Sequence, residues 1–236
     1  MRRLAQVAAV AIAFVGATSA EAQLPTVQQV YDKFATAVGG RAAWKPIVGR
    51  TEKGTADITF AGMSGSYERY NALPNKMRMI IDIGVVKIDQ GFDGQQGWVS
   101  QGQGAQPMPA EQVKQMSESV SDGAAFLDPS RYAKADVIGK EAFDGVEAYK
   151  VAITLKSGQE SVEYFDVASG LRVGAINTTP AGEVRVTYRD YKDFEGKRLP
   201  TKIIQGTAQG DVVLNIQIVS FGAPDATVFK SPLGGN

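Results

Sequence analysis

Residues 184–221 read VRVTYRDYKDFEGKRLPTKIIQGTAQGDVVLNIQIVSF, with glycine turns at Gly196 and Gly210 between runs rich in Val, Ile, Tyr and Phe. Glycine enters the left-handed conformations that tight hairpins require, and β-branched and aromatic residues fit a pleated surface. In the last run, alternate positions carry apolar residues that would share one face, namely Val212, Leu214, Ile216 and Ile218. The stretch therefore predicts consecutive antiparallel strands with one apolar face.

The same punctuation continues upstream through Gly145, Gly158, Gly170 and Gly182, at intervals of 12 to 14 residues. The run Val146–Lys156 again alternates, and its apolar face carries Tyr149, Val151, Ile153 and Leu155. Even spacing of turns between short β-rich runs is typical of a meander, in which each strand lies beside the one before it. We expect a large curved sheet, one face of which has to be covered.

The first half of the chain also alternates with a period of two. The runs expected as strands are Glu52–Phe60, Ser64–Leu73, Lys76–Ile83, Val85–Phe92 and Gly97–Gln101. Their apolar positions include Ala56, Ile58 and Phe60 in the first run, and Met77, Met79, Ile81 and Ile83 in the third. We therefore expect about eleven strands in all, mostly antiparallel.

One amphipathic helix precedes the β pattern and a second one interrupts it. Thr26–Val38 carries an apolar stripe at steps of three and four, a capping box formed by Thr26 and Gln29, and a Gly-Gly stop. A short turn is expected at Arg41–Ile47, and a second helix at Pro109–Val120 after a loop at Gly102–Pro109. We expect the helices to lie across the concave face of the sheet.

The N-terminal 22 residues have the pattern of a secretory signal peptide. A basic start at Arg2 and Arg3 precedes the apolar run Ala5–Ala17, and Ala20-Glu21-Ala22 places small residues where a signal peptidase reads them. The run is shorter than the roughly 20 apolar residues that a membrane span needs. The sequence thus predicts cleavage near Ala22, export to the periplasm, one domain over residues 23–222, and a C-terminal tail over 223–236.

Composition excludes several functional classes. Removing Arg2, Arg3 and Glu21 from 25 basic and 25 acidic residues leaves 23 and 24, a net charge of −1 that does not favour nucleic acid. The chain has no histidine, which removes the commonest general base and metal ligand. It also has no cysteine, so disulfides and a cysteine-linked lipid anchor are excluded. We expect a soluble monomer with no cofactor and no metal.

No catalytic motif is present. The carboxylate pairs Asp190/Asp193 and Glu163/Asp166 could be drawn as acid–base pairs, but their basic neighbours favour solvent-exposed strand faces. Gly62-Met63-Ser64-Gly65-Ser66 lacks the spacing of a nucleophile elbow, and no histidine exists to activate its serines. The sequence therefore favours a binding protein over an enzyme, although carboxylate-only catalysis stays open as a hypothesis.

The methionines cluster in the first half of the chain, with Trp98 among them, which is compatible either with a packed core or with a cavity for an apolar ligand. On the cavity hypothesis, the lining residues come from the apolar strand faces and from the second helix. They are Ile58, Phe60, Met77, Met79, Ile81, Trp98, Val113, Met116, Tyr149, Val151, Ile153, Leu214 and Ile216. The face of each strand is inferred from apolarity alone.

The order of elements resembles the outer-membrane lipoprotein carrier superfamily (LolA/LolB-like), within its "outer membrane lipoprotein-sorting protein" branch. The stretches that carry the resemblance run from about residue 26 to 222. They are 38–44, 50–57, 67–76, 90–98, 139–151, 164–171 and 190–200. The resemblance implies an unclosed β-barrel lidded by helices, with Arg41 and the neighbouring Trp44 at the lid.

The resemblance also implies a role. It points to a carrier that shelters lipid or lipoprotein acyl chains, working alone or with an inner-membrane transporter or an outer-membrane acceptor. Because the superfamily includes periplasmic regulators, an envelope sensor or adaptor that binds a protein partner remains the alternative.

Overall fold

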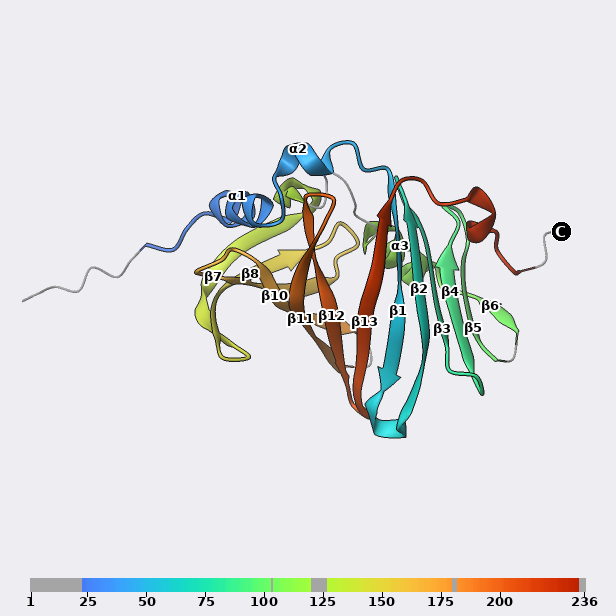
Figure 1. Cartoon of the computed structure of the whole chain (residues 1–236). Coiled ribbons are helices and arrows are strands. Elements are labelled where there is room, and N and C mark those ends of the chain that lie inside the picture. The colour runs from blue at the N-terminus through green and yellow to red at the C-terminus, as the bar shows by residue number, and fades with distance from the viewer. Residues whose placement is uncertain (1–22, 103, 120–126, 180–181, 234–236) are drawn as a thin grey trace, which may run out of the picture.

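The computed structural model describes residues 23–233 except 103, 120–126 and 180–181, and it contains one antiparallel sheet with three α-helices (Figure 1). The predicted signal peptide, residues 1–22, lies outside the described residues. No helix in the described part of the chain is long and apolar enough to span a membrane.

The α-helices are α1 (Val27–Ala37), α2 (Arg41–Trp44) and α3 (Ala110–Ser119), and short 3-10 turns are η1 (Thr59–Ala61), η3 (Pro129–Arg131) and η4 (Ala226–Phe229). The strands of the first half are β1 (Gly49–Ile58), β2 (Met63–Ala72), β3 (Lys76–Asp82), β4 (Lys87–Phe92), β5 (Gly97–Gln101) and β6 (Ala105–Pro107). Those of the second half are β7 (Lys134–Phe143), β8 (Val146–Thr154), β9 (Glu160–Asp166), β10 (Arg172–Thr179), β11 (Gly182–Phe194), β12 (Lys197–Thr207) and β13 (Gly210–Phe221).

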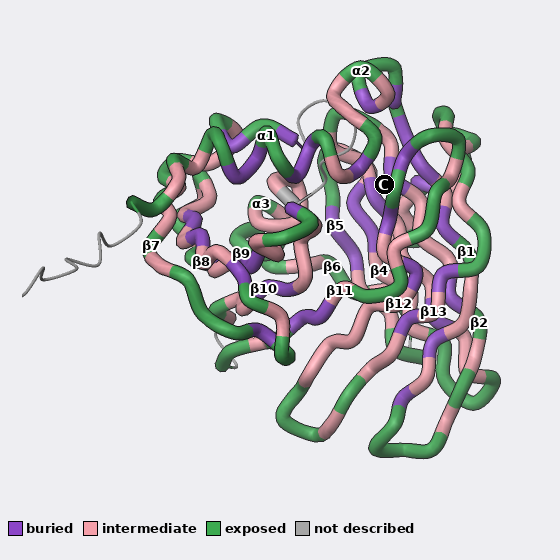
Figure 2. The backbone as a smooth tube through the Cα atoms, turned by 60° about the vertical axis from the view of Figure 1, so that its left-hand side comes forward, coloured by how far each residue is buried: buried purple, intermediate pink, exposed green. Residues whose placement is uncertain are grey.

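The thirteen strands follow one another in the sheet as two meanders joined edge to edge. Their order is β6-β5-β4-β3-β2-β1-β13-β12-β11-β10-β9-β8-β7, so β1 pairs with β13 and the two ends of the sheet are β6 and β7. Figure 2 shows the sheet curving around α3, with α1 across one end. This confirms the predicted unclosed half-barrel. Of its strands, β6 lies inside the predicted Gly102–Pro109 loop.

Helix α1 forms as its sequence predicts. The Thr26 hydroxyl accepts a hydrogen bond from the Gln29 amide, and the Gln29 side chain accepts from the Thr26 amide, which completes the capping box. The apolar stripe packs inward, because Val30, Tyr31 and Phe34 are buried. After the helix, Gly39 has a positive φ and lies so close to the Gly196 carbonyl that a β-carbon would clash.

A β-bulge between β1 and β13 corrects one sequence prediction. The pairing shifts register between Lys53 and Gly54, so that Lys53 faces Ile218 and Gly54 faces Ile216. An extra residue in one strand turns the following side chains to the other face. Ile218 is therefore 59% exposed, whereas Leu214 and Ile216 are buried as predicted.

The segment predicted as a C-terminal tail packs onto the sheet through η4. The Val228 carbonyl accepts a hydrogen bond from Arg78 Nη1 on β3, and Phe229 is buried. Arg78 faces away from Met77 and Met79 on the same strand, so η4 covers the outer, convex surface.

Candidate functional site

Cross-strand pairing places most of the predicted lining residues on one face of the sheet. Met79 lies opposite Arg69, Ala56 opposite Leu214, and Val151 opposite Glu163. Because directly paired residues share a face, the pairings can be followed strand by strand across the sheet. They bring together Ile58, Met77, Met79, Ile81, Tyr149, Val151, Ile153, Leu214 and Ile216.

This shared face is the concave one, because both helices pack on it. On α1, the Tyr31 hydroxyl reaches Glu163, which is paired with Val151. On α3, Val113 packs at Gly97, which is paired with Phe92; a β-carbon at Gly97 would come within 2.8 Å of Val113 Cγ2. A glycine at position 97 thus lets the helix approach the sheet closely.

Part of the concave face forms a surface that we name the apolar strip. Its buried members are Ala56, Tyr67, Ile81, Leu214 and Ile216, and its partly exposed members are Met79, Ile83, Ile88, Ile203 and Val212. They come from β1–β4, β12 and β13, and Ile83 lies directly after β3. The strip therefore crosses six consecutive strands of the sheet, from β4 through β1 to β13 and β12. Apolar side chains left partly exposed on a concave surface are suited to binding an apolar ligand.

Helix α3 connects the two sides of the concave face. Val113 and Met116, which the sequence predicts to lie on the lid, are half-buried. At its other end, the Glu118 carbonyl accepts a hydrogen bond from Arg131, and the Glu118 carboxylate accepts one from the Ser157 amide, each at 3.0–3.1 Å. The helix is therefore attached near β4 at one end and near the β8–β9 turn at the other.

The structure does not bring Trp98 into this site. Trp98 pairs with Gly91, whose neighbours Gln90 and Phe92 face the concave side, so Trp98 points to the convex side. There its Nε1 lies 3.4 Å from Asp89, and the Arg78 guanidinium lies 6.0 Å from its ring centroid. Trp98 is fully buried, and the prediction failed because a buried apolar residue can belong to either face.

Phe60 also lies outside the concave face. The strand that was expected to reach Phe60 ends at Ile58, and Phe60 falls in η1, where it is 49% exposed beside Gly210. Alternation predicts a residue's face only while the strand continues, and the left-handed Gly62 ends this turn.

The part of the concave face formed by β8 and β9 is covered by α1. Tyr31 and Phe34 pack against Phe165 with ring centroids 5.2 and 5.4 Å apart, and Val151 and Ile153 join the same buried cluster. Of the predicted lid contacts, Trp44 is fully buried and donates to the Val38 carbonyl. Arg41 bridges two segments, since it donates to the Leu127 carbonyl at 2.5 Å and to Asp32 at 2.8 Å.

A buried polar network lies beneath α1. Glu163 on β9 accepts a 2.5 Å hydrogen bond from the Tyr31 hydroxyl and pairs with Arg172 on β10 at 2.7 Å. The Tyr132 hydroxyl lies 3.2 Å from that of Tyr31. Burial, reinforced by the Glu163 carboxylate, raises the pKa of Tyr31, and the same two causes raise the pKa of Tyr132 to about 12. Both phenols thus stay protonated at neutral pH, and Tyr31 donates to the carboxylate.

Glu163 shows where the sequence interpretation was wrong. We expected it on a solvated strand face, but it is 5% exposed. Its neighbours two residues away, Ser161 and Phe165, are also buried, so alternation did place it on an inward face. The alternation of residues therefore did indicate an inward position for Glu163. A carboxylate is rarely buried without a partner, however. Arg172 could not be assigned as that partner before the pairing of β9 and β10 was known.

A second buried ion pair lies on the concave face at the start of β1. Arg50 Nε is 3.1 Å from Glu52, and the Tyr67 hydroxyl donates to Glu52 at 3.2 Å. Arg69 lies directly opposite Glu52, and its Nε donates to Asn71. Burial raises the pKa of Tyr67, and the nearby Glu52 carboxylate raises it further. The sequence analysis did not single out any of these residues.

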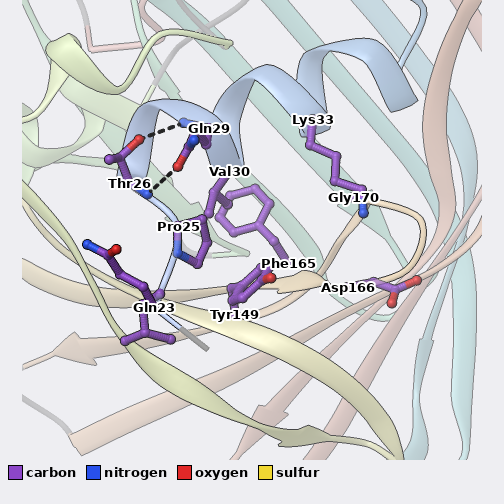
Figure 3. Close-up of a pocket in the computed structure, with 11 residues that line it drawn as sticks. Gln23, Pro25, Thr26, Gln29, Val30, Lys33, Tyr149, Phe165, Asp166 and Gly170 are labelled. Atoms are coloured by element: carbon purple, nitrogen blue, oxygen red, sulfur yellow. Dashed lines mark hydrogen bonds between the residues drawn. The ribbon is translucent and has the colours of Figure 1, made fainter. Parts of the chain in front are cut away.

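A pocket of about 590 Å³ lies at the outer end of the concave face (Figure 3). Val30, Tyr149 and Phe165 form its apolar side, and Lys33 crosses Gly170 to donate to the Val167 carbonyl at 2.5 Å. The remaining lining residues are Gln23, Leu24, Pro25, Thr26, Gln29 and Asp166. Of the predicted lining set, Tyr149 borders this pocket.

The described residues contain no cluster of three or more His, Cys, Asp or Glu side chains that could hold a metal ion. The polar groups on the concave face include two acid–guanidinium pairs, each hydrogen-bonded to a tyrosine hydroxyl. Such groups can orient a polar or charged ligand group beside an apolar surface.

The chain forms an unclosed antiparallel half-barrel whose apolar concave face is covered in part by helices. This chain has the fold of the LolA superfamily. Its structure is similar to that of a LolA superfamily protein from Nitrosomonas europaea, with a TM-score of 0.56 and 15% identity, covering 88% of this chain and 99% of the other. The resemblance inferred from the order of elements is thereby confirmed at the level of the fold.

Two further solved structures have the same fold. A DUF1329 family protein from Desulfovibrio piger gives a TM-score of 0.56 at 14% identity, over 86% of this chain and 99% of the other. A domain from Vibrio parahaemolyticus, described as an outer membrane lipoprotein-sorting protein, gives 0.52 at 10% identity, over 82% and 91%. No protein-family model and no curated protein sequence matches the chain.

Proposed function

We propose that this protein is an exported carrier or binding protein that shelters an acyl chain, from a lipid or a lipoprotein, between the apolar strip and α3. The observation that supports this most directly is the partial exposure of Met79, Ile83, Ile88, Ile203 and Val212 on the concave face. The LolA-like fold and the N-terminal export signal predicted over residues 1–22 agree with this role.

The driving force is removal of apolar surface from water. Each methylene that is buried contributes about 0.8 kcal/mol, so a chain of several methylenes on the strip gains several kcal/mol before ordering costs are subtracted. Release requires either movement of α3 or a competing acceptor. The attachment of α3 through polar bonds at Glu118, rather than through a fully buried apolar face, is compatible with such movement.

The chain offers a matched pair of variants to test the site. Ile203 and Ile204 are adjacent on β12 and both half-buried, but Ile203 lies opposite Leu214 on the concave face, whereas Ile204 lies opposite Val213 on the convex face. A carboxylate at position 203 would face the ligand tail without compensation, so Ile203→Glu should weaken binding at least about tenfold. Ile204→Glu should leave it nearly unchanged.

The measurement is titration of delipidated protein with a fluorescent fatty acid. Absence of saturable binding to the wild-type protein would overturn the proposal. Equal loss in both variants would remove the strip as the site, and loss in Tyr149→Ala alone would instead place the ligand in the pocket beside α1. If no lipid binds and a crosslinked pull-down recovers a stable membrane-protein complex, the sensor or adaptor alternative would be favoured.

A further inference from the structure

The pocket of about 590 Å³ beside α1 is separate from the apolar strip (Figure 3). It is formed by α1, by the segment 23–26 that leads into this helix, and by residues of β8, of β9 and of the turn after β9. In the sheet, β10 and β11 lie between these strands and β12, where the strip begins. A small molecule in this pocket would therefore occupy a different part of the protein from the proposed acyl chain.

One side of the pocket is apolar and aromatic. Tyr149 on β8 and Phe165 on β9 lie directly opposite each other, and Val30 of α1 packs in the same cluster. Val30 and Phe165 are buried, whereas Tyr149 is partly exposed and Leu24 is 42% exposed. An accessible phenol ring beside an exposed leucine suits the flat, apolar body of a small aromatic molecule.

Three residues that line the pocket have hydrogen-bond donors that the described part of the chain leaves unused. An ammonium carries three N–H groups, and Lys33 uses one of them to donate to the Val167 carbonyl at 2.5 Å. The side-chain oxygen of Gln29 belongs to the capping box, but its amide nitrogen meets no acceptor among the described residues. The Tyr149 hydroxyl also has no partner there. These groups can donate to a ligand.

The carboxylate that lines the pocket is already satisfied. Asp166 Oδ1 accepts a hydrogen bond from the Ala168 amide at 2.9 Å, and Oδ2 accepts from the amide and the hydroxyl of Ser169. Burial acts to raise the pKa of Asp166, but these hydrogen bonds, with Lys33 as a smaller cause, lower it overall. Asp166 is thus stabilised as an anion by its own turn, and the unused groups favour a ligand that accepts hydrogen bonds.

We propose that this pocket binds a small aromatic carboxylic acid, with its ring against Tyr149 and its carboxylate at Lys33. Gln29 and Lys33 are four residues apart on α1 and so share a face of the helix, which lets the Gln29 amide donate a second hydrogen bond. This inference goes beyond the proposed function, because it adds a ligand of another class at a separate site. A ligand held by both α1 and the sheet also stabilises their contact.

The experiment compares 2-naphthoic acid with the neutral 2-naphthamide, which has the same ring system. Each is titrated by calorimetry into delipidated full-length wild type, Lys33→Met, Lys33→Arg and the control Lys150→Met. Lys150 follows Tyr149 on β8 but faces the convex side, where it lies 3.2 Å from Glu141. We expect wild type and the control to bind the acid at least about tenfold more tightly than the amide. Lys33→Met should lose that preference while binding the amide as wild type does, and Lys33→Arg should keep it.

Two further variants locate the ligand. Tyr149→Ala removes the aromatic wall but no charge, so it should weaken binding of the acid and the amide alike by about two- to tenfold. Ile203→Glu, on the apolar strip, should leave the binding of both unchanged. Bound 2-naphthoic acid should also slow hydrogen exchange over Val27–Ala37 in the wild-type protein.

The outcomes separate this site from the proposed function. Equal binding of acid and amide by wild type, or an intact preference in Lys33→Met, would contradict the assignment of an acid. Weaker binding of the acid in Ile203→Glu would place the ring on the strip and overturn the second site. If wild type binds neither naphthalene probe but binds a fatty acid, the second site fails alone; the reverse result overturns the proposed function alone. Circular dichroism establishes that each variant is folded, and Lys33→Gln provides the same test if Lys33→Met is not.

Discussion

Beneath α1 the concave face is filled by the protein's own side chains, whereas across β3, β4 and β12 the strip retains partly exposed apolar residues. On the first side, Tyr31 and Phe34 cover Phe165, and Val151 is fully buried. On the second, Met79 and Ile203 are partly exposed. Both sides are built from the same alternation of apolar residues. The difference lies in what covers them, which is a capped helix with bulky aromatic residues in one case and α3 in the other.

The largest expected effect tests whether the α1 side is core and the strip is surface. Phe34→Ala removes a side chain that is 2% exposed, and it should lower the free energy of unfolding by about 3–5 kcal/mol. Met79→Ala, at a partly exposed position, should cost less than half as much, because fewer contacts and a smaller cavity are involved. Urea unfolding measured in the absence of lipid provides both values.

The stabilisation that a bound ligand adds should be affected in the opposite order, more by Met79→Ala than by Phe34→Ala. A saturating fatty acid stabilises the folded state through binding, and Met79→Ala should lose part of that increment while Phe34→Ala keeps it. Similar losses of stability in the two variants, together with similar responses to the ligand, would contradict the division of the concave face into a filled side and a binding side.

The sequence was sufficient to predict the meander, both amphipathic helices and most of the concave face. Alternation is a local property, so it placed Met77, Met79 and Ile81 together without any knowledge of their neighbours. The capping box of Thr26 and Gln29 is equally local and was correctly predicted. Trp98, Phe60 and Ile218 escaped prediction because a face assignment needs the pairing register, the end of a strand or the position of a bulge.

The polar residues of the concave face could not be predicted for a different reason. Glu163 and Arg172 lie on adjacent strands, and Tyr31 meets them from a helix more than a hundred residues away in the chain. A buried carboxylate becomes plausible only when its partners are known, and these partners come together only in the folded sheet. The candidate site is therefore predictable in its apolar part and not in its charged part.

A smaller substitution should weaken the contact between α1 and the sheet without opening a large cavity. Tyr31→Phe removes the hydroxyl that donates to the buried Glu163, and loss of a hydrogen bond to a charged acceptor should cost about 1.5–3 kcal/mol. Tyr149→Phe is the matched control, since its hydroxyl has no hydrogen bond within the described part of the chain, and it should cost about 0.5 kcal/mol or less. Hydrogen exchange should accelerate over Val27–Ala37 in Tyr31→Phe alone. If α1 exchanges at the wild-type rate, the network does not hold the helix.

At neutral pH the smallest effect belongs to Tyr132, on the α1 side, because its contribution changes with pH only above about pH 10. The pKa of Tyr132 is raised to about 12, mainly by burial and then by Glu163, whereas in the unfolded chain it is about 10. Below pH 10 both states hold the proton, so the full stability is present. Above pH 10 the unfolded state loses its proton first, and stability falls by about 1.4 kcal/mol per pH unit until the phenol of the folded state also titrates.

Tyr132→Phe should remove this contribution, so the stability of the variant should fall less steeply than that of wild type between pH 10 and 12. Tyr67 and Tyr191, whose pKa values are also raised by burial, remain in both proteins and cancel in the comparison. Tyr132 also contributes to the raised pKa of Tyr31, so the substitution lowers that contribution and acts in the same direction. Parallel curves for wild type and variant over that interval would show that Tyr132 is not held neutral beneath the helix.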